Sequence, residues 1–156
     1  MMKALILGAA MALVAPHAPA DGHAAHETGG PTSPEKMSKA EIAGAIFSDP
    51  RMIRQMHGKG DSAYETLDVE NFLSKDKQFD SGMYQSGAVR AEIERYGVDE
   101  FMYFLKGGVT LTSKDGTVME IKAGDAVTIP RDWAGVWDTK GYTKIYVIYS
   151  PDGPIE

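Results

Sequence analysis

From residue 79 to residue 150 the chain alternates apolar and polar side chains in short runs, and glycine or proline separates most of them. These runs include "VRAEIERY", "EFMYFLKG", "GVTLTS", "TVMEIKAG", "AVTIP" and "TKIYVIYS", which are rich in residues that favour strands. "SKDG" predicts a hairpin turn, with Gly116 where a positive φ angle is needed. We interpret the pair Gly107 and Gly108 as a second turn between strands. Many short strands with tight turns indicate a sandwich or a closed barrel, because both leave few exposed sheet edges.

Two motifs occur in order within this segment. Glu100 is followed after six residues by Gly107, and Gly124 is followed after five residues by Pro130. With the "KDG" hairpin, "AGDAVTIP" and the late run "KIYVI", these motifs make the segment resemble a cupin. The resemblance is to the subfamily of ureidoglycine aminohydrolase-like and ethanolamine-utilisation-like cupins, and it covers residues 79–149. It implies an all-β fold, the double-stranded β-helix or RmlC-like jelly roll, here preceded by two short helices.

The cupin signatures usually supply three histidines and a glutamate to a metal ion. In this chain the paired histidines of the first signature fall at Glu94 and Tyr96, or at Ile93 and Arg95. The histidine of the second signature falls at Gly135. A transition metal needs three or four ligands in a fixed geometry, and Glu100 alone survives of the expected set. The sequence therefore predicts no bound cofactor, and a weakly held divalent metal is the alternative.

Without a metal, a cupin barrel still offers a concave interior with a few polar groups, as small-molecule sites do. If Glu100 points inward, alternation along the strand places Met102 and Phe104 on the same face. On the last strand Lys144 and Tyr146 share a face, and the resemblance favours that face as the one lining the pocket. Glu100 and Lys144 are thus predicted to form an inward pair of carboxylate and ammonium.

Two interpretations of this pair stay open. It is either a structural ion pair that satisfies two buried charges, or a catalytic pair in which Glu100 is a general acid or base and Lys144 orients an anionic substrate. Aromatic side chains are expected to line the same pocket, and the indole N–H of Trp137 can donate a hydrogen bond to a ligand. The candidate ligand-binding residues are Trp137, Tyr96, Glu94, Tyr146, Tyr103 and Met102.

The N-terminal sequence predicts an export signal. A lysine, a short apolar run and the small residues "APA" before Asp21 follow the pattern of a cleavable signal peptide. The apolar run is shorter than the roughly 20 residues that span a bilayer. We expect a signal peptide over 1–20, a flexible leader over 21–36, a helical extension packed on the barrel over 37–78 and the cupin domain over 79–156. The location would be periplasmic or secreted.

Two helices are expected in the extension. Ser38 and Glu41 have the spacing of a capping box and predict a helix over 39–47. Asp49 and Pro50 have the residue types that start a helix, and Gly58 would end this second helix.

The composition and charge of the chain exclude several classes of function. The net charge of −6 without a basic cluster argues against nucleic acid as a partner, and the absence of cysteine excludes disulfides and cysteine nucleophiles. Two hypotheses remain. The chain binds a small polar or anionic metabolite without turning it over, or it is a hydrolase, lyase or isomerase that uses Glu100. Small cupins commonly pair through sheet edges, so a homodimer is expected.

Overall fold

The computed structural model describes residues 31–155. The predicted signal peptide and leader residues 21–30 lie outside the described residues. The described chain begins with the helix α1 (Lys39–Ile42) and the 3-10 helix η1 (Ala45–Ser48), and a second 3-10 helix, η2 (Gly60–Ser62), follows the first strand. The strands are β1 (Ile53–His57), β2 (Tyr64–Leu73), β3 (Phe79–Ser86), β4 (Val89–Ile93), β5 (Asp99–Ser113), β6 (Val118–Lys122), β7 (Ala126–Ile129) and β8 (Gly135–Tyr149).

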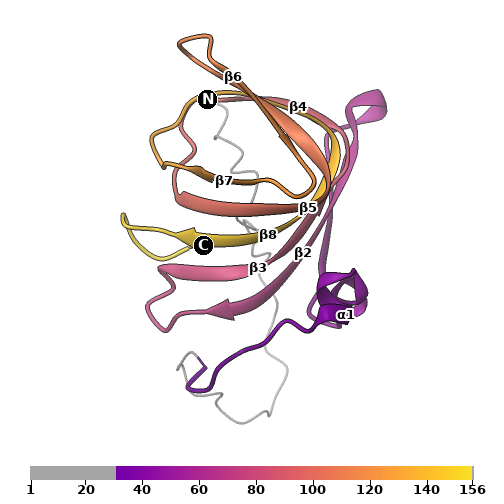
Figure 1. The fold of residues 1–156 in the computed structure, drawn as a ribbon, viewed down its shortest axis with the longest axis vertical. Helices are drawn as coiled ribbons and strands as arrows, with labels where there is room; N and C mark the ends of the chain where they lie inside the picture. The colour runs from indigo at the N-terminus through magenta and orange to yellow at the C-terminus, as the bar shows by residue number, and fades with distance from the viewer. Residues whose placement is uncertain (1–30, 156) are drawn as a thin grey trace, which may run out of the picture.

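The strands build two packed layers that share the long strands β5 and β8 (Figure 1). The first half of β5 and the second half of β8 lie between β7 and β3, and β2 and β1 extend this layer. The other halves of β5 and β8 lie between β6 and β4. Every pairing is antiparallel. The predicted all-β jelly roll is confirmed.

Each long strand changes the face that it turns to the core where it passes between layers. In β5 the buried positions are even up to Phe104 and odd from Val109, with a bulge between Phe104 and Lys106. In β8 they are odd up to Thr139, and from Tyr142 they are even, with Thr143 as a further buried residue. An extra residue in one strand of a pair shifts the alternation by one and bends the strand. The two bulges thus let one pair of strands line both layers.

The two glycines that were predicted to form a turn lie inside β5, so that prediction is wrong. β5 continues through Gly107 and Gly108 and pairs with β8 on both sides of them. Gly107 has φ +65°, and a Cβ there would lie 2.0 Å from the backbone oxygen of Gly141. Glycine serves here to let two backbones approach at the bend, rather than to reverse the chain.

The first predicted helix is confirmed at its start. Ser38 and Glu41 form the capping box: the Glu41 N–H donates to Ser38 Oγ at 3.2 Å, and the Ser38 N–H donates to Glu41 Oε2 at 2.6 Å. The α-helix ends at Ile42, and after Gly44 the chain continues as η1. Ile46 of η1 packs with Val69 and Met83, which point away from the barrel interior. The two short helices therefore cover the outer side of β2 and β3.

The second predicted helix is wrong. Asp49 accepts a hydrogen bond from the Arg51 N–H in a turn, and residues 53–57 form β1. Ile53 pairs with Asp68 and His57 with Tyr64, so β1 and β2 form a hairpin. Pairing with a strand later in the chain overrides the local helix signal in this segment. The sheet therefore also includes β1 and β2, which precede residue 79, where the cupin domain was expected to begin.

His57 is the last residue of β1. Its Nε2 lies 2.8 Å from Thr66 Oγ1, and its ring stacks on Tyr64 with centroids 4.8 Å apart. Burial lowers the pKa of His57 below its ordinary value.

The hairpin turn predicted from "SKDG" is confirmed, and a second short turn precedes β7. Gly116 has φ +86° in the hairpin between β5 and β6. Asp125 accepts from the Lys122 N–H at 2.8 Å in the turn before β7, beside Gly124 with φ +93°. Within residues 31–155 no helix is long and apolar enough to cross a membrane.

Candidate functional site

A buried polar cluster lies at the centre of the barrel, and its members are Glu100, Lys144 and Tyr96. Lys144 Nζ lies 2.5 Å from Glu100 Oε1 and 3.1 Å from Met102 Sδ. The Tyr96 hydroxyl donates to Glu100 Oε2. Glu100 and Lys144 have no exposed surface and Tyr96 only 1%. The structure thus joins Glu100 and Lys144, as the alternation along the two strands predicts.

Strand register brings these groups together from distant parts of the sequence. Glu100 lies on β5 opposite Ile148 of β8, and Lys144 lies on β8 opposite Phe104 of β5. On its other side Lys144 pairs with Tyr84 of β3. Tyr96 comes from the loop between β4 and β5, where its N–H donates to the Trp133 carbonyl at 2.9 Å.

Aromatic rings surround the ammonium of Lys144. Its Nζ lies 5.5 Å from the ring centroid of Tyr84 and 5.8 Å from those of Trp137 and Tyr142. At such distances a ring face attracts a cation, and the attraction is stronger away from water. The ammonium is therefore held by one carboxylate and three rings, so both charges of the pair are stabilised inside the barrel.

The tyrosines of the interior stay protonated at neutral pH. Burial, and next the negative charge of Glu100, raise the pKa of Tyr96 well above its ordinary value. Burial, and next the neighbouring Tyr84, raise the pKa of Tyr142 in the same way. These hydroxyls consequently keep their protons: that of Tyr96 is donated to Glu100, and that of Tyr142 can be donated to another acceptor.

Buried polar atoms of three aromatic residues have no hydrogen-bond partner among the described residues. They are Trp137 Nε1, Tyr142 Oη and Tyr64 Oη. Trp137 stacks on Tyr96 with centroids 6.4 Å apart and contacts Tyr142 with centroids 5.8 Å apart. Buried polar atoms are usually paired, and each such exception calls for an explanation. The predicted role of Trp137 as a donor to a ligand fits this position.

A second polar group was missed from the sequence: Asp68 on β2 and Asp80 on β3, with Tyr146 between them. The Tyr146 hydroxyl lies 3.1 Å from Asp68 Oδ1 and 3.4 Å from Asp80 Oδ2. Burial raises the pKa of Asp68 from 3.8 to about 7, against the opposing effects of Tyr146 and Lys144. Burial, then Glu70 and Asp68, raise the pKa of Asp80 to about 7 as well.

Alternation along β2 and β3 could have indicated these two aspartates. Asp68 lies between the apolar residues Leu67 and Val69, and Asp80 is two residues before Gly82. The cupin motifs do not include β2, so only the sheet register places these side chains against Tyr146.

The other predicted ligand-binding residues divide between the interior and the surface. Met102 and Tyr146 are buried in the barrel with Trp137 and Tyr96. Tyr103 lies on the opposite face of β5 and is 39% exposed, because strand neighbours alternate. Glu94 is exposed in the loop after β4. The structure places Tyr103 and Glu94 away from the interior cluster.

The side chains at the signature positions do not fit a histidine-bound metal. Glu94 is exposed, Gly135 has no side chain, and both oxygens of Glu100 are taken by Tyr96 and Lys144. A lysine ammonium repels a second cation at the one carboxylate that the motif retains. Within residues 31–155 no group of three or more His, Cys, Asp or Glu side chains is arranged to hold a metal ion.

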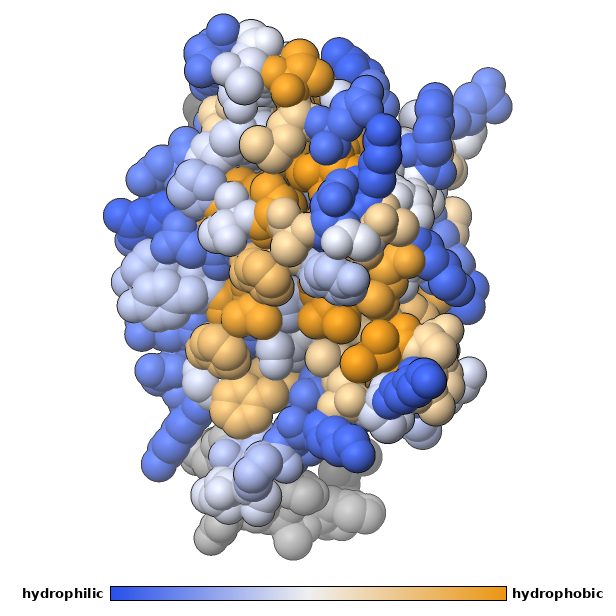
Figure 2. All heavy atoms as spheres, viewed as in Figure 1, coloured by the Kyte–Doolittle hydropathy of each residue, from blue (hydrophilic) through white to orange (hydrophobic). Residues whose placement is uncertain are grey.

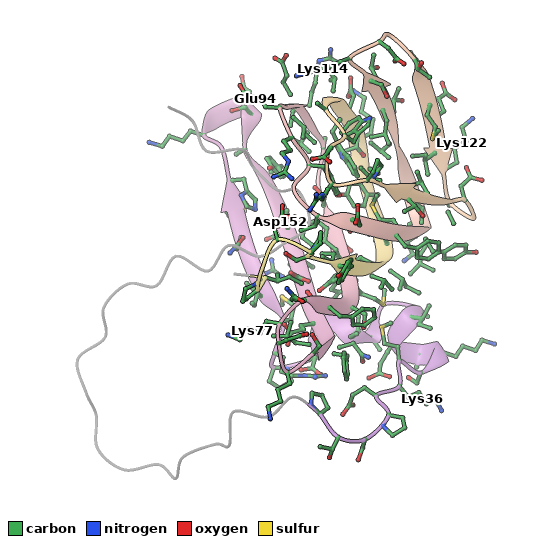
Figure 3. The ribbon with its side chains drawn as sticks, turned by 90° about the vertical axis from the view of Figure 1, so that its left-hand side faces the viewer. Lys36, Lys77, Glu94, Lys114, Lys122 and Asp152 are labelled. Atoms are coloured by element: carbon green, nitrogen blue, oxygen red, sulfur yellow. The ribbon has the colours of Figure 1, made fainter. Side chains whose placement is uncertain are left out.

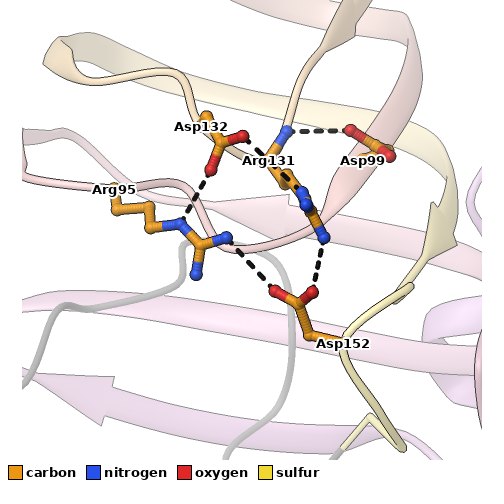
Figure 4. A network of polar contacts seen from close by, with 5 residues as sticks. All are labelled: Arg95, Asp99, Arg131, Asp132 and Asp152. Carbon is orange, nitrogen blue, oxygen red and sulfur yellow. Dashed lines mark hydrogen bonds and ion pairs between the residues drawn. The ribbon is translucent and has the colours of Figure 1, made fainter.

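The C-terminal residues 150–155 follow β8, and the Ser150 N–H donates to the Gln78 carbonyl at 2.8 Å; we call these residues the C-terminal strap. Asp152 Oδ1 lies 2.5 Å from Arg131 Nη1, and its Oδ2 lies 3.2 Å from Arg95 Nη2 (Figure 4).

The same close-up shows how the strap connects to the two loops beside Tyr96. Asp132 binds Arg95 at 2.9 Å, and Asp99 accepts from the Arg131 N–H at 2.9 Å (Figure 4). The Ile155 N–H donates to the Lys77 carbonyl at 2.7 Å, and its side chain packs on the main core. Figure 3 looks onto this end of the barrel, with Asp152 between Glu94 and Lys77.

Comparison with known families identifies the segment that carries the site. The family model described as the EutQ-like cupin domain matches residues 73–146. The matched segment covers less than half of the chain, and it is similar to the EutQ-like cupin domain. It contains Glu100, Lys144 and Trp137, and it begins before the boundary at residue 79 that the motifs suggested.

Solved structures support the fold. A protein of unknown function from Pseudomonas syringae pv. tomato, which belongs to the DUF861 family, superposes with a TM-score of 0.52 at 16% identity. The match covers 62% of this chain and 44% of the Pseudomonas protein, so the chain spans less than half of that protein.

Two ethanolamine-utilisation proteins are also similar to this chain. The EutQ protein of Clostridium difficile has a TM-score of 0.49 at 16% identity, over 67% of this chain and 99% of that protein. The putative ethanolamine utilisation protein Q of Salmonella typhimurium has a TM-score of 0.48 at 17% identity, over 67% and 98%. No curated protein matches the chain.

Proposed function

We propose that this cupin-domain protein binds a small polar or anionic metabolite in the barrel interior, without a histidine-bound metal. The observation that carries the proposal is the pair of unpartnered buried polar atoms, Trp137 Nε1 and Tyr142 Oη, on two rings whose centroids lie 5.8 Å from Lys144 Nζ. An unsatisfied buried polar group costs about 1–3 kcal/mol, so two of them beside the same ammonium are expensive unless something binds to them.

The kind of ligand follows from the chemistry of these atoms. An indole N–H only donates, and a protonated tyrosine hydroxyl donates as well as accepts. A ligand with carbonyl, hydroxyl or carboxylate oxygens supplies the acceptors that are missing. The nearby cation of Lys144 favours a negative end of that ligand. The surrounding rings favour a small and partly apolar body.

Binding fits the cluster better than catalysis by Glu100. A general base needs a free oxygen within hydrogen-bond reach of the substrate, and both oxygens of Glu100 are engaged. Catalysis of the hydrolase, lyase or isomerase type, including the ureidoglycine aminohydrolase reaction, is the alternative proposal. It requires Tyr96 or Lys144 to release Glu100 when a substrate binds.

The proposal is tested at the indole groups, because the chain has two tryptophans. We expect acetate, lactate or malonate to shift the indole N–H signal of Trp137 in a saturable titration by nuclear magnetic resonance. The signal of Trp133 stays in place, because its Nε1 already donates to Ser113 Oγ at 3.0 Å. Trp137→Phe keeps most of the ring and removes the donor, so it should weaken binding about tenfold.

Trp133→Phe is the matched control, since it removes an indole donor that already has a partner. It should lower stability and leave the affinity for the carboxylate unchanged. Titrations that move neither indole signal with any of the three anions, or equal affinity in Trp137→Phe, would contradict the proposal.

We also propose that the protein is exported, on the signal-peptide pattern of residues 1–20. The N-terminal sequence of protein recovered from the periplasm or the medium tests it, and a chain that starts at Met1 would contradict it.

We propose, finally, a homodimer through the outer face of β5, β8 and β3. Phe101, Tyr103, Phe79 and Tyr149 are 39–49% exposed there, and Phe79 pairs directly with Tyr149. Hydrophobic side chains gather over the middle of the face seen in Figure 2. Exposed apolar patches of this kind are typical of interaction sites. Sedimentation of Phe101→Glu as a monomer and of the unaltered chain as a dimer is the expected result.

A further inference from the structure

The pair of aspartates below the strap is the strongest polar feature that the proposed anion site does not use. Asp68 and Asp80 retain 8% and 6% of their surface, whereas Glu100 and Lys144 retain none. The aspartates therefore lie nearer to solvent than the central ion pair.

Asp80 has an acceptor without a donor. Its Oδ2 lies near the Tyr146 hydroxyl, and its Oδ1 is buried without a hydrogen-bond partner among residues 31–155. Tyr146 has one hydroxyl proton, and the nearer of its two carboxyl partners is Asp68, at 3.1 Å. The two carboxyl groups thus share a single protein donor, and at least one acceptor position remains open beside them.

The charged groups around Asp68 and Asp80 are mostly negative. Glu70 of β2 and Glu100 of β5 add negative charge, and Lys144 of β8 supplies the opposing ammonium. That ammonium is already bound to Glu100. A buried carboxylate without a bound cation keeps a proton instead, because the neutral form is cheaper to bury.

We propose that Asp68, Asp80 and Tyr146 form a subsite for a primary ammonium group of a small ligand. The ammonium offers three donors, enough for the free oxygen of Asp80 and the carboxyl group of Asp68. It replaces the proton that the pair otherwise holds, and that proton leaves to solvent. Charge-assisted hydrogen bonds of this kind are about twice as strong as neutral ones.

This subsite rests on the proposed function in one respect: the barrel interior is where the ligand binds. It adds that the ligand carries an amine toward the strap, while its acceptor end faces Trp137 and Tyr142. A ligand that satisfies both ends of the site is an amine that also carries a hydroxyl, carbonyl or carboxylate group. The two ends are separable, because each has its own probe and its own reporter.

Methylammonium chloride is the probe, and the side-chain carboxyl carbons of Asp68 and Asp80 are the reporters in a titration by nuclear magnetic resonance. We expect saturable shifts of both signals. The affinity should increase as the pH rises through about 7, because a methylammonium group of the lysine type stays charged until about pH 10 while the carboxyl protons leave. Asp80→Asn should weaken binding at least about tenfold. Asp68→Asn, the second variant if the first does not fold, should do the same.

The matched control is Asp61→Asn, which removes one exposed acid in η2 and should bind methylammonium like the unaltered chain. The absence of a saturable shift above pH 7 would overturn the subsite. So would an equal affinity for methylammonium in Asp80→Asn, or an affinity for methylammonium that does not change with pH. If acetate fails to move the Trp137 indole signal while methylammonium binds at Asp80, the anion site of the proposed function fails and the subsite stands. The reverse result rejects the subsite alone.

Discussion

Replacing Lys144 by methionine removes the ammonium from the buried pair and keeps the length of the side chain. The Glu100 carboxylate then lies in the core with only the Tyr96 hydroxyl to bind it. Breaking a fully buried ion pair on one side costs about 3–5 kcal/mol, mainly because the remaining charge is uncompensated. The loss of contacts between the ammonium and three rings at 5.5–5.8 Å acts in the same direction.

We expect Lys144→Met to lower the free energy of unfolding by about 3–5 kcal/mol in urea titrations. For a chain of this size that loss corresponds to a decrease in Tm of roughly 6–20 °C. The double variant Glu100→Gln with Lys144→Met removes both charges, so it should recover at least half of the loss. Lys140→Met, an exposed lysine of the same strand, is the control and should change stability by less than about 0.5 kcal/mol.

The double variant decides between two readings of the result. If the single variant is destabilised and the double variant recovers, the cost comes from the unpaired carboxylate. A double variant less stable than Lys144→Met alone would refute this reasoning. So would a single variant within about 1 kcal/mol of the unaltered chain, since surface ion pairs contribute no more than that.

Three further predictions concern the acid pair, the bend and the strap. Burial raises the pKa of Asp80 from 3.8 to about 7, so its protonated form favours folding below pH 4 and this contribution is lost as the pH rises to about 7. Asp80→Asn should therefore gain stability relative to the unaltered chain between pH 4 and 7, as urea midpoints measure. Gly107→Ala should cost more than about 2 kcal/mol, because its Cβ would lie 2.0 Å from a backbone oxygen, whereas Gly116→Ala meets no atom within 4 Å and should cost only about 1–2 kcal/mol. Asp152→Asn should speed amide hydrogen exchange at Ile155 while global stability changes by less than about 1 kcal/mol, because its partners are exposed.

Each of these has a result that contradicts it. The first fails if Asp80→Asn and the unaltered chain keep a constant difference in stability across that pH range. Equal costs of the two glycine substitutions would remove the argument from the close backbone approach. Unchanged exchange at Ile155 would mean that hydrogen bonding to Lys77 and core packing, and not the ion pairs, hold the strap.

Alternation within single strands, together with the cupin resemblance that selected the inward face of the last strand, was enough to place several site residues. Glu100 and Met102 face the interior on one strand, Lys144 and Tyr146 on another, and all four are buried as expected. The same rule places Tyr103 on the outer face, although its aromatic side chain suggested a role in the pocket. Residue type alone is a weaker guide than strand parity, because parity fixes the side of the sheet.

The N-terminal part shows where local signals fail. The capping box at Ser38 acts within one turn of chain, and it predicted the start of α1 correctly. The helix expected after Asp49 is instead β1, since residues 53–57 hydrogen-bond with β2 and not with each other. A strand pairing across a hairpin involves residues that a local propensity does not consider.

The sequence by itself determined the jelly roll, the inward parity of β5 and β8 around the site, and the meeting of Glu100 with Lys144. The jelly roll and the inward face of β8 follow from the resemblance that short motifs carry, and the two-residue period then places Glu100 and Lys144 on inward faces. Only the tertiary structure decided the bulges that turn each long strand from one layer to the other, and the grouping of Asp68 and Asp80 around Tyr146. Those features depend on the register between strands far apart in the chain, where a shift of one residue moves every side chain to the other face.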